Sequence, residues 1–383
     1  MVQFTHVNVF GTCFEVTTSS AIDELICSQV TVKKITKPFR NSELSQKAYL
    51  ELKLLKHLKH ENIAALRDVF MSPEDNIYLI TEHQDASLEQ LILSQPLGET
   101  HYTKVFLYQI LRGLKYIHSA NVVHCNLKPS NILIGHNCDL RITDFDHARI
   151  QGTKVTEPFS EIQCFRTPEL LLGECTYEFA IDMWSVGYIF ARMINRELFS
   201  LEDWKVNSLH AIGYPPRSMM SGIDDANISE NLEPLLNTRC KPLRCYINTT
   251  DLEAMGLAEH LLAFDPKARY QANQALLHKY VSFYHDPDDE PVSEQRWSVS
   301  DTDYVNLPVD TWKTLISLSE ILDHHNKQLS SEVSSKTIVI FRITTFPTMT
   351  ASSPAPPPLK LPSREERAGF QPKLSRAIRP VLE

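Results

Sequence analysis

Alternating apolar and polar residues first predict a β-strand at residues 30–35, VTVKKI, which is rich in β-branched side chains. In the segment 41–60, leucine and alanine recur every three or four positions. This spacing predicts the apolar face of a helix, with Asn41 or Ser42 as its N-cap. A second apolar run at residues 76–84, NIYLITEHQ, predicts another strand. The first part of the chain is therefore expected to be rich in strands and to contain one helix.

From residue 102 onward the pattern becomes mainly helical, with one short strand expected at residues 139–145, DLRITDF. The segments expected to be helical are 102–121, 180–195, 252–266 and 272–281. The two patterns together predict an α+β fold, with a small strand-rich part at residues 1–82 and a larger helical part at 83–285. Their linker lies near residues 83–87, and ligand sites favour clefts between such parts.

The end of the chain differs in composition from the rest. Residues 331–383 hold eight Lys and Arg against four Asp and Glu, and eight of the 22 prolines. Such a composition does not easily bury a core, so we expect residues 330–383 to be mostly disordered. Their one apolar run, TIVIFRITTF, allows either a stray strand or an aggregation-prone segment.

Composition also limits the partners and the compartment. The formal net charge is −9, which is not the basic signature of a nucleic-acid-binding protein. No run of eighteen apolar residues occurs, so we expect neither nucleic acid nor a membrane as a partner. The eight cysteines are scattered without a CxxC pair, and the first residues, MVQFTHVNVF, lack the features of a secretory signal. These observations indicate a reducing, intracellular setting.

The first sign of chemistry is the stretch VVHCNLKPSNILI at residues 122–134. It has the shape of a catalytic loop, in which His124 comes first, Asn131 comes last and Lys128 lies between them. Where such a loop offers a carboxylate, this chain has Asn126. The loop therefore belongs either to a catalyst with a substituted base or to a protein that kept the scaffold without the chemistry.

Further motifs surround this loop in a recognisable order. They are VTVK ending at Lys33, Glu51, the loop itself, Asp144 with Phe145, Pro168 with Glu169, and the run from Asp182 to Gly187. This ordered set resembles that of a eukaryotic protein kinase over about residues 4–326. The phrases KKITKPF, LKLLKHLKHENI, YHDPDDEP and LPVDTWKTL are similar to those of a stress-activated MAP kinase of the high-osmolarity type. The resemblance implies a bilobal protein-kinase fold.

The resemblance also implies roles in binding ATP and Mg²⁺. Lys33 would hold the α- and β-phosphates and pair with Glu51. Asn131 and Asp144 would ligate Mg²⁺, and Lys128 would steady the transferred phosphoryl group. The alternatives are a surface lysine near a strand end, a turn asparagine and a capping aspartate.

The linker between the two lobes would bind adenine. Thr81 would be the gatekeeper, and Glu82 to Gln84 would offer backbone groups to the base. The alternative is an ordinary linker, since backbone recognition leaves little trace in a sequence. Glu169 would pair with Arg269 and Asp182 would brace the catalytic loop, which are structural roles.

The chain departs from the family at the phosphate-covering loop, where G-x-G-x-x-G lets backbone N–H groups approach phosphate. No glycine occurs between Gly11 and Gly98. The segment TTSSAIDELICSQ before VTVK is also too short for the two strands and loop that the family has there. We therefore expect the first hairpin of the small lobe to be missing, through evolutionary loss or a misjoined gene model.

Substitutions in the catalytic loop and after it touch separate parts of the mechanism. Asn126 replaces the Asp base, and its amide takes up no proton near neutral pH, although its oxygen still allows it to orient a hydroxyl. Cys125 replaces the Arg that would grip an activation-loop phosphate. Asp146 replaces the Gly of D-F-G, and His147 adds bulk beside it.

The activation segment and the ribose contact differ as well. Where the family has Thr-Gly-Tyr, this chain runs from Thr156 to Phe159, so Thr156 stays a candidate for phosphorylation and dual phosphorylation is excluded. Ser87 replaces an Asp that would contact ribose. Together with the changes in the loop, these losses predict a kept fold and abandoned catalysis.

One feature of the family is retained in this sequence. Asp286, Asp288 and Asp289, followed by Glu290, match the acidic common-docking patch with which MAP kinases hold basic peptides. The alternative is a solvated acidic turn. Residues 286–329 are expected to form this patch and a C-terminal extension that packs on the kinase.

Three functions are compatible with these observations. The first is a MAP-kinase-family protein, Ser/Thr-specific by descent, that is catalytically impaired and acts by docking partners of a stress pathway. The second is a functional ATP-dependent Ser/Thr kinase, and the third is a non-functional relic. The resemblance implies ATP and Mg²⁺ as cofactors if nucleotide binding is retained. It implies a MAP-kinase kinase and protein substrates as partners through a basic docking peptide, and a monomer in the cytoplasm and nucleus.

Overall fold

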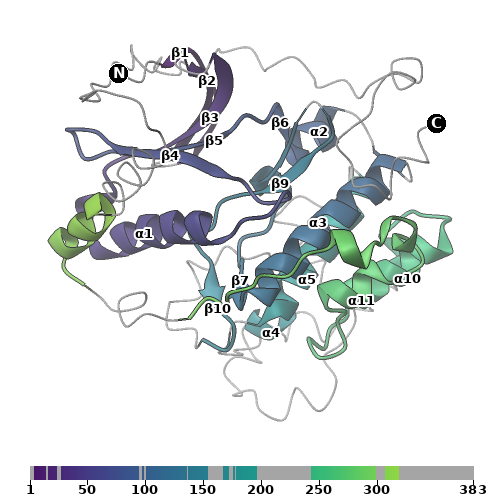
Figure 1. Ribbon diagram of the computed structural model, residues 1–383. Coiled ribbons are helices and arrows are strands. Elements are labelled where there is room, and N and C mark those ends of the chain that lie inside the picture. The colour runs from purple at the N-terminus through teal and green to yellow at the C-terminus, as the bar shows by residue number, and fades with distance from the viewer. Residues whose placement is uncertain are drawn as a thin grey trace. The chain divides into compact units, whose positions relative to one another are not determined.

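The computed structural model divides the chain into two compact units. The first combines Met1–Asp85 with Val299–Pro358, and the second combines Ala86–Ser298 with Leu359–Glu383. The residues that the structure describes are 4–13, 16–23, 27–94, 97–98, 101–135, 137–153, 167–171, 176, 178–195, 243–298 and 307–318. The first unit is built on a sheet and the second is mainly helical, which confirms the α+β fold expected from the sequence (Figure 1).

The first unit contains a five-stranded antiparallel sheet with the strand order β1-β2-β3-β5-β4. The strands are β1 (Phe4–Cys13), β2 (Val16–Asp23), β3 (Ser28–Ile35), β4 (Leu66–Met71) and β5 (Ile77–Glu82). A cluster of buried side chains covers one part of it, namely Ala21, Val30, Val32, Phe70, Tyr78 and Ile80. Alternate residues of a strand point to opposite faces, so Val30, Val32 and Ile80 contribute to one face of the sheet.

The sheet corrects the expectation that the first hairpin is missing. Strands β1 and β2 pair antiparallel, from Phe4 opposite Asp23 to Cys13 opposite Val16, and β2 continues the sheet next to β3. The prediction failed because the strands come from residues 4–23, most of which precede the short segment on which it was based. The absence of glycine between Gly11 and Gly98 is a property of the sequence and stands.

The helix of the first unit, α1 (Ser42–His57), begins at the expected cap. The side chain of Asn41 accepts a hydrogen bond from the backbone N–H of Leu44 at 2.8 Å. The short 3₁₀ helix η1 (Pro38–Arg40) leads into it. Helix α1 buries Ala48, Leu52 and Leu55, as the leucine spacing predicted, and its middle turn from Ala48 to Leu52 is buried on all sides.

Residues 309–318, near the end of the described chain, are helical and pack on α1. The Trp312 ring is fully buried and lies 5.3 Å from the Tyr49 ring. Its indole N–H donates to the hydroxyl of Ser42 at 3.2 Å, and that hydroxyl donates to the backbone oxygen of Leu307 at 2.7 Å. The C-terminal segment thus completes the core of the first unit.

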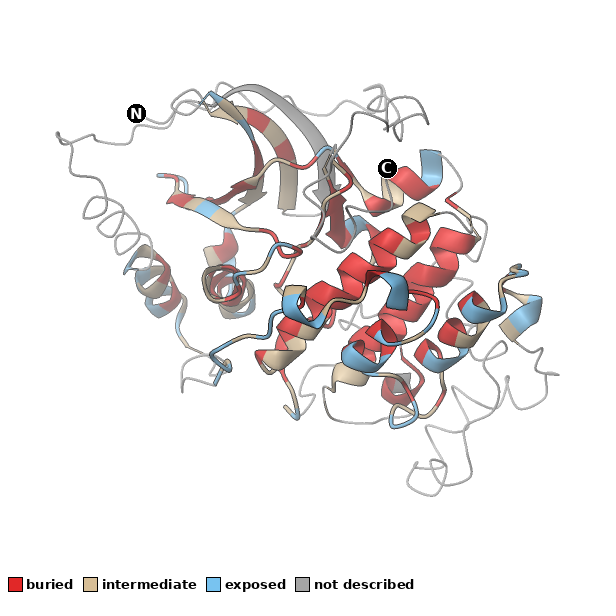
Figure 2. Cartoon of the chain, turned by 45° about the vertical axis from the view of Figure 1, so that its right-hand side comes forward, coloured by how far each residue is buried: buried red, intermediate tan, exposed pale blue. Residues whose placement is uncertain are grey.

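The second unit is organised around α3 (His101–Ser119) and α5 (Phe179–Ile194), which are buried along most of their length (Figure 2). The other helices described there are α2 (Leu88–Ser94), α4 (Pro168–Leu171), α10 (Leu252–Leu261) and α11 (Ala272–Leu276), with the 3₁₀ helices η2 (Pro129–Asn131), η3 (Leu243–Cys245), η4 (Ser282–Tyr284) and η5 (Pro287–Asp289). Gly187 lets α5 approach the end of α10, because a Cβ there would lie 2.7 Å from the side chain of Leu262. None of the described helices is both long and apolar enough to cross a membrane.

Short strands connect these helices and hold the loops. They are β6 (Ala86–Ser87), β7 (Val122–Val123), β8 (Ile132–Ile134), β9 (Leu140–Ile142) and β10 (Arg149–Ile150), arranged as β6-β8-β9 and β10-β7. The strand expected to extend to residue 145 ends at Ile142. Asp144 then has φ = +74°, in the left-handed region, which a regular strand does not allow.

Helices α10 and α11 end about five residues earlier than expected. Helix α10 ends at Leu261 instead of residue 266, because Pro266 disfavours helical geometry at Asp265. Helix α11 ends at Leu276 and η4 follows it. The tail expected at residues 330–383 lies outside the described residues.

We predict that Trp312→Ala lowers the free energy of unfolding by about 3–5 kcal/mol, the usual cost of removing a fully buried large aromatic ring. Urea denaturation followed by fluorescence measures it. Lys313→Ala is the matched control, because the Lys313–Asp75 ion pair is 39% and 42% exposed. It should cost less than about 1 kcal/mol. Equal stability of Trp312→Ala and the unmodified chain would contradict the contact with α1.

Candidate functional site

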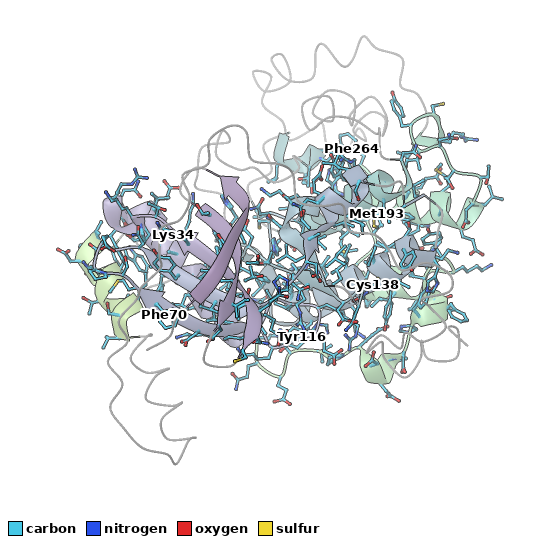
Figure 3. The ribbon with its side chains drawn as sticks, turned by 90° about the horizontal axis from the view of Figure 1, so that it is seen from above. Lys34, Phe70, Tyr116, Cys138, Met193 and Phe264 are labelled. Carbon is cyan, nitrogen blue, oxygen red and sulfur yellow. The ribbon has the colours of Figure 1, made fainter. Side chains whose placement is uncertain are left out.

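Lys33 on β3 and Glu51 on α1 form an ion pair inside the first unit. The Lys33 Nζ donates to both carboxylate oxygens, at 2.7 and 2.9 Å. Only 14% of the Lys33 side chain and 2% of the Glu51 side chain are exposed. A buried carboxylate needs a paired cation, so the two residues hold β3 against α1. Figure 3 labels the next residue of β3, Lys34.

The residues expected to bind adenine lie at the end of β5 and directly after it. Thr81 and Gln84 are buried, and Glu82 lies 3.9 Å from the guanidinium of Arg67. The backbone N–H of Gln84 donates to the hydroxyl of Thr31 at 3.4 Å. Their role in binding a nucleotide stays a prediction.

The catalytic loop of the second unit is held by the fully buried carboxylate of Asp182 on α5. Its oxygens accept hydrogen bonds from the backbone N–H groups of His124 at 2.8 Å and Cys125 at 2.9 Å. The ring nitrogen Nε2 of His118 lies 2.9 Å from the same carboxylate. Cys125 has φ = +62°, a backbone conformation that residues other than glycine rarely adopt. Asp182 therefore supports this unusual backbone by accepting the N–H groups of Cys125 and of the residue before it.

The His124 ring is fully buried and bonds both to its own loop and to Thr143, which follows β9. Its Nδ1 accepts the backbone N–H of Asn126 at 3.2 Å, and its Nε2 donates to the backbone oxygen of Thr143 at 3.0 Å. Burial lowers the pKa of His124, and the nearby carboxylate of Asp182 opposes this shift. A neutral ring with its proton on Nε2 satisfies both contacts, so His124 acts here as a structural connector.

The structure brings Asn126, Asn131 and Asp144 together. The amide nitrogen of Asn126 donates to the Oδ2 atom of Asp144 at 3.2 Å, and that of Asn131 donates to the same oxygen at 2.9 Å. Asn131 also donates to the backbone oxygen of Asn126 at 2.9 Å. The side-chain oxygen of Asn126 is buried and has no hydrogen-bond partner among the described residues. The site therefore contains one carboxylate faced by two amide nitrogens.

Protein kinases use ATP together with Mg²⁺, so the donor set can be compared with what this cation requires. Mg²⁺ takes oxygen ligands in near-octahedral geometry. Asn131 and Asp144 are the residue types expected, but the amide nitrogens of Asn126 and Asn131 both donate to the Oδ2 atom of Asp144. The arrangement does not fit the cation as it stands. Lys128, the residue expected to steady the phosphoryl group, is partly exposed at the N-cap of η2.

Two of the substituted positions fit the fold well. Cys125 is buried in an apolar cluster with Val123, Leu170 and Ile181, so nothing there replaces the charge of the expected arginine. Asp146 does not have a positive φ, so the glycine is not needed for backbone conformation. Its carboxylate lies 3.8 Å from the ring of His147.

Glu169 on α4 makes the expected ion pair with Arg269. The guanidinium donates to both carboxylate oxygens and also to the backbone oxygens of Ala180 and Phe264. It lies over the Trp184 ring at 4.7 Å. This buried, fully bonded pair ties α4 to α5. Thr156, the predicted phosphorylation site, lies outside the described residues.

The acidic segment around η5 is partly neutralised by α3. Asp289 lies 3.2 Å from the guanidinium of Arg112, and the buried carboxylate of Glu290 accepts from Lys115 at 3.0 Å. Asp286 caps the turn by accepting the N–H of Asp288 at 3.1 Å, and Asp288 is exposed. Of the acids predicted to dock peptides, Asp288 and Asp286 are therefore the ones whose charge is not opposed by α3.

Sequence reasoning missed Arg112 and Lys115 because they lie about 175 positions away from the acids they bind. Their spacing of three on α3, which puts both on one helix face, was the available signal. Burial, with a smaller contribution from the carboxylate of Glu290, raises the pKa of Tyr108 on the same helix. The charges of α3 and of the acidic segment thus partly offset one another.

Comparison with known proteins gives consistent matches. The family described as protein kinase domain matches residues 9–281. The mitogen-activated protein kinase HOG1 of Gibberella zeae is 44% identical over 349 residues, which cover 85% of this chain and 96% of that protein. The mitogen-activated protein kinase hog-1 of Neurospora crassa is 43% identical, over 87% of this chain and 98% of its own. The mitogen-activated protein kinase sakA of Aspergillus fumigatus is 45% identical, with 85% and 93% covered.

We predict that Lys33→Ala lowers the free energy of unfolding by about 3–5 kcal/mol, because it leaves the carboxylate of Glu51 buried without its cation. The double change Lys33→Met with Glu51→Leu should recover most of this loss, since no buried charge is left. Guanidinium denaturation without nucleotide compares the three proteins. A double variant no more stable than Lys33→Ala would show that the pair does not act through its charges.

Proposed function

Because the chain belongs to the protein kinase family, as a mitogen-activated protein kinase of the HOG1 type, we propose that it is a catalytically impaired member that acts by binding partners of a stress pathway. The observation that carries this proposal is the side chain of Asn126. It stands at the position of the base, and its amide nitrogen donates to Asp144. The site thus has a hydrogen-bond donor where phosphoryl transfer uses a proton acceptor.

The impairment follows from what an amide does. General-base help is worth about 10²- to 10⁴-fold in rate, and an asparagine takes up no proton near neutral pH. The missing glycines remove backbone N–H donors from the triphosphate as well. Cys125, buried in its apolar cluster, offers no cation to an activation-loop phosphate. Each change acts on a different part of one mechanism.

ATP binding is the second part of the proposal. Lys33 is supported by Glu51 in the geometry expected for holding phosphates, and the backbone after Thr81 would contact adenine. Without the glycine loop, this binding is weak and depends on Lys33. The intact ion pair also favours the alternative function, a slow but real ATP-dependent Ser/Thr kinase.

Docking is the function that the substitutions leave untouched. We propose that Asp288 and Asp286, supported by Asp289, bind a Lys- and Arg-rich peptide of a MAP-kinase kinase or of a protein substrate. Opposite charges at the rim of an interface set the on-rate and the choice of partner, and need neither nucleotide nor metal. A monomer in the cytoplasm and nucleus is the state proposed for this activity.

We predict that the purified chain transfers phosphate to a basic protein substrate at least about 10³-fold more slowly than an intact relative, because it lacks the base. A radiometric assay with ATP and Mg²⁺ measures the turnover. Asn126→Asp should raise it only modestly, since the glycine loop is still absent. A turnover near the usual range of about 1–100 s⁻¹ would rule out the impairment and favour the kinase function.

For docking, we predict that the double change Asp286→Asn with Asp288→Asn lowers the affinity for a basic peptide roughly two- to thirtyfold. This follows from about 0.2–1 kcal/mol for each ion pair that is lost between an acid and the peptide. The affinity of the unmodified chain should fall steeply with salt. Glu259→Gln, which changes an acid on α10 that is exposed as Asp288 is, serves as the control and should not change binding. Fluorescence anisotropy at low and high salt compares them. Equal affinity of all three proteins would exclude the docking surface and favour a relic.

A further inference from the structure

The carboxylate of Asp144 is the point where the second unit would hold a cation. Two amides already approach its Oδ2 atom, Asn126 at 3.2 Å and Asn131 at 2.9 Å. Hydrogen bonds to an ionised acceptor are roughly twice as strong as those between neutral groups. The positive ends of two N–H dipoles therefore lie against the oxygen that a divalent cation would otherwise bind.

The orientation of both amides follows from their surroundings. Turning the Asn126 amide round would place its oxygen against a carboxylate oxygen, which is repulsive. The Asn131 nitrogen donates to two acceptors at once, Asp144 and the backbone oxygen of Asn126, so reversing it would lose both bonds. The nitrogen atoms are thus fixed toward Asp144, and the buried oxygen of Asn126 is left without a partner among the described residues.

We propose that the amides of Asn126 and Asn131 take the place of the divalent cation at Asp144, so that this loop holds its geometry without metal. An aspartate at position 126 would bring a second negative charge to about the same distance, and the repulsion would favour binding of a cation there. Asparagine removes that charge and supplies a donor. The substitution therefore does more than delete a base: it also removes the charge that a cation would offset. The proposal is independent of the docking surface.

Asp146 is the one further carboxylate nearby in sequence. Its side chain is 26% exposed and lies 3.8 Å from the His147 ring. Among the described residues, no group of three or more His, Cys, Asp or Glu is arranged to hold a metal ion. Asp146 therefore enters the test as a possible competing ligand.

The test is a titration of the full chain with Mn²⁺, a spectroscopic substitute for Mg²⁺, followed by electron paramagnetic resonance of the free ion. At about 1 mM Mn²⁺, the range of weak oxygen-ligand sites, the unmodified chain and Asp144→Asn should bind the same number of ions. Asn126→Asp should gain one site, at least about tenfold tighter than any Asp144-dependent binding in the unmodified chain, because the ligand charge rises. Asp144→Asn introduced into that variant should abolish it.

Two results would overturn the proposal. One is Mn²⁺ binding by the unmodified chain that Asp144→Asn removes, and the other is the lack of any gained site in a folded Asn126→Asp variant. Binding that only Asp146→Gly removes lies at the competing carboxylate and leaves Asp144 without a cation, as proposed. If that variant does not fold, Asn126→Ala serves instead, since it removes one N–H donor without adding charge.

Thermal unfolding at constant ionic strength provides the second measurement. Mg²⁺ should leave the melting temperature of the unmodified chain unchanged, whereas Asn126→Asp should melt lower without Mg²⁺ and recover when it is added. An Asp144-dependent rise in the unmodified chain would show that the amides do not replace the cation.

Discussion

The buried carboxylate of Asp182 determines the shape of the catalytic loop and of everything that the loop presents. It accepts the N–H groups of His124 and Cys125, and so stabilises the left-handed backbone at Cys125. His124 then accepts the N–H of Asn126, whose side chain reaches Asp144. A single helix position thus fixes, through three successive contacts, a carboxylate near the other end of the site. Without its hydrogen bonds, a carboxylate so deeply buried would be strongly destabilising.

The substitutions lie at positions that this framework does not need for folding. Cys125 bonds to Asp182 through its backbone, so its side chain can change from an arginine to a thiol that lies in an apolar cluster. Asp146 adopts an ordinary φ, so the glycine can be replaced. The structural pair of Glu169 and Arg269, by contrast, is complete and buried. The fold and the chemistry of this family can therefore diverge independently, because different atoms of neighbouring residues support them.

The sequence predicted those features that depend on neighbouring residues. The leucine spacing of α1 and its Asn41 cap are local, and both are present. Helix ends were less accurate where Pro266 or a following turn intervened, since periodicity does not register them. The β1–β2 hairpin was missed because a comparison by length placed the strands in the wrong segment.

The pattern of apolar and polar residues does not predict contacts between residues that are distant in the sequence. The ion pairs of Arg112 and Lys115 join residues about 175 positions apart, and only the folded chain shows that they offset the acidic segment. The family resemblance identified Asn126 as a lost base. That its nitrogen contacts Asp144 depends on the loop geometry, so the sequence indicated the loss and the structure indicated what replaced it.

The buried position of Trp312 also constrains the order in which the chain folds during synthesis. Its partner Ser42 lies 270 positions earlier in the chain. At about 5–20 residues per second, the ribosome needs roughly 15–55 s to reach the tryptophan after α1 has emerged. During this interval the face of α1 around Tyr49 lacks its cover, and closing so long a loop is a slow step. Residues 1–85 of the first unit are thus synthesised before residues 86–298 of the second, and their core is completed only after residue 312 has been made.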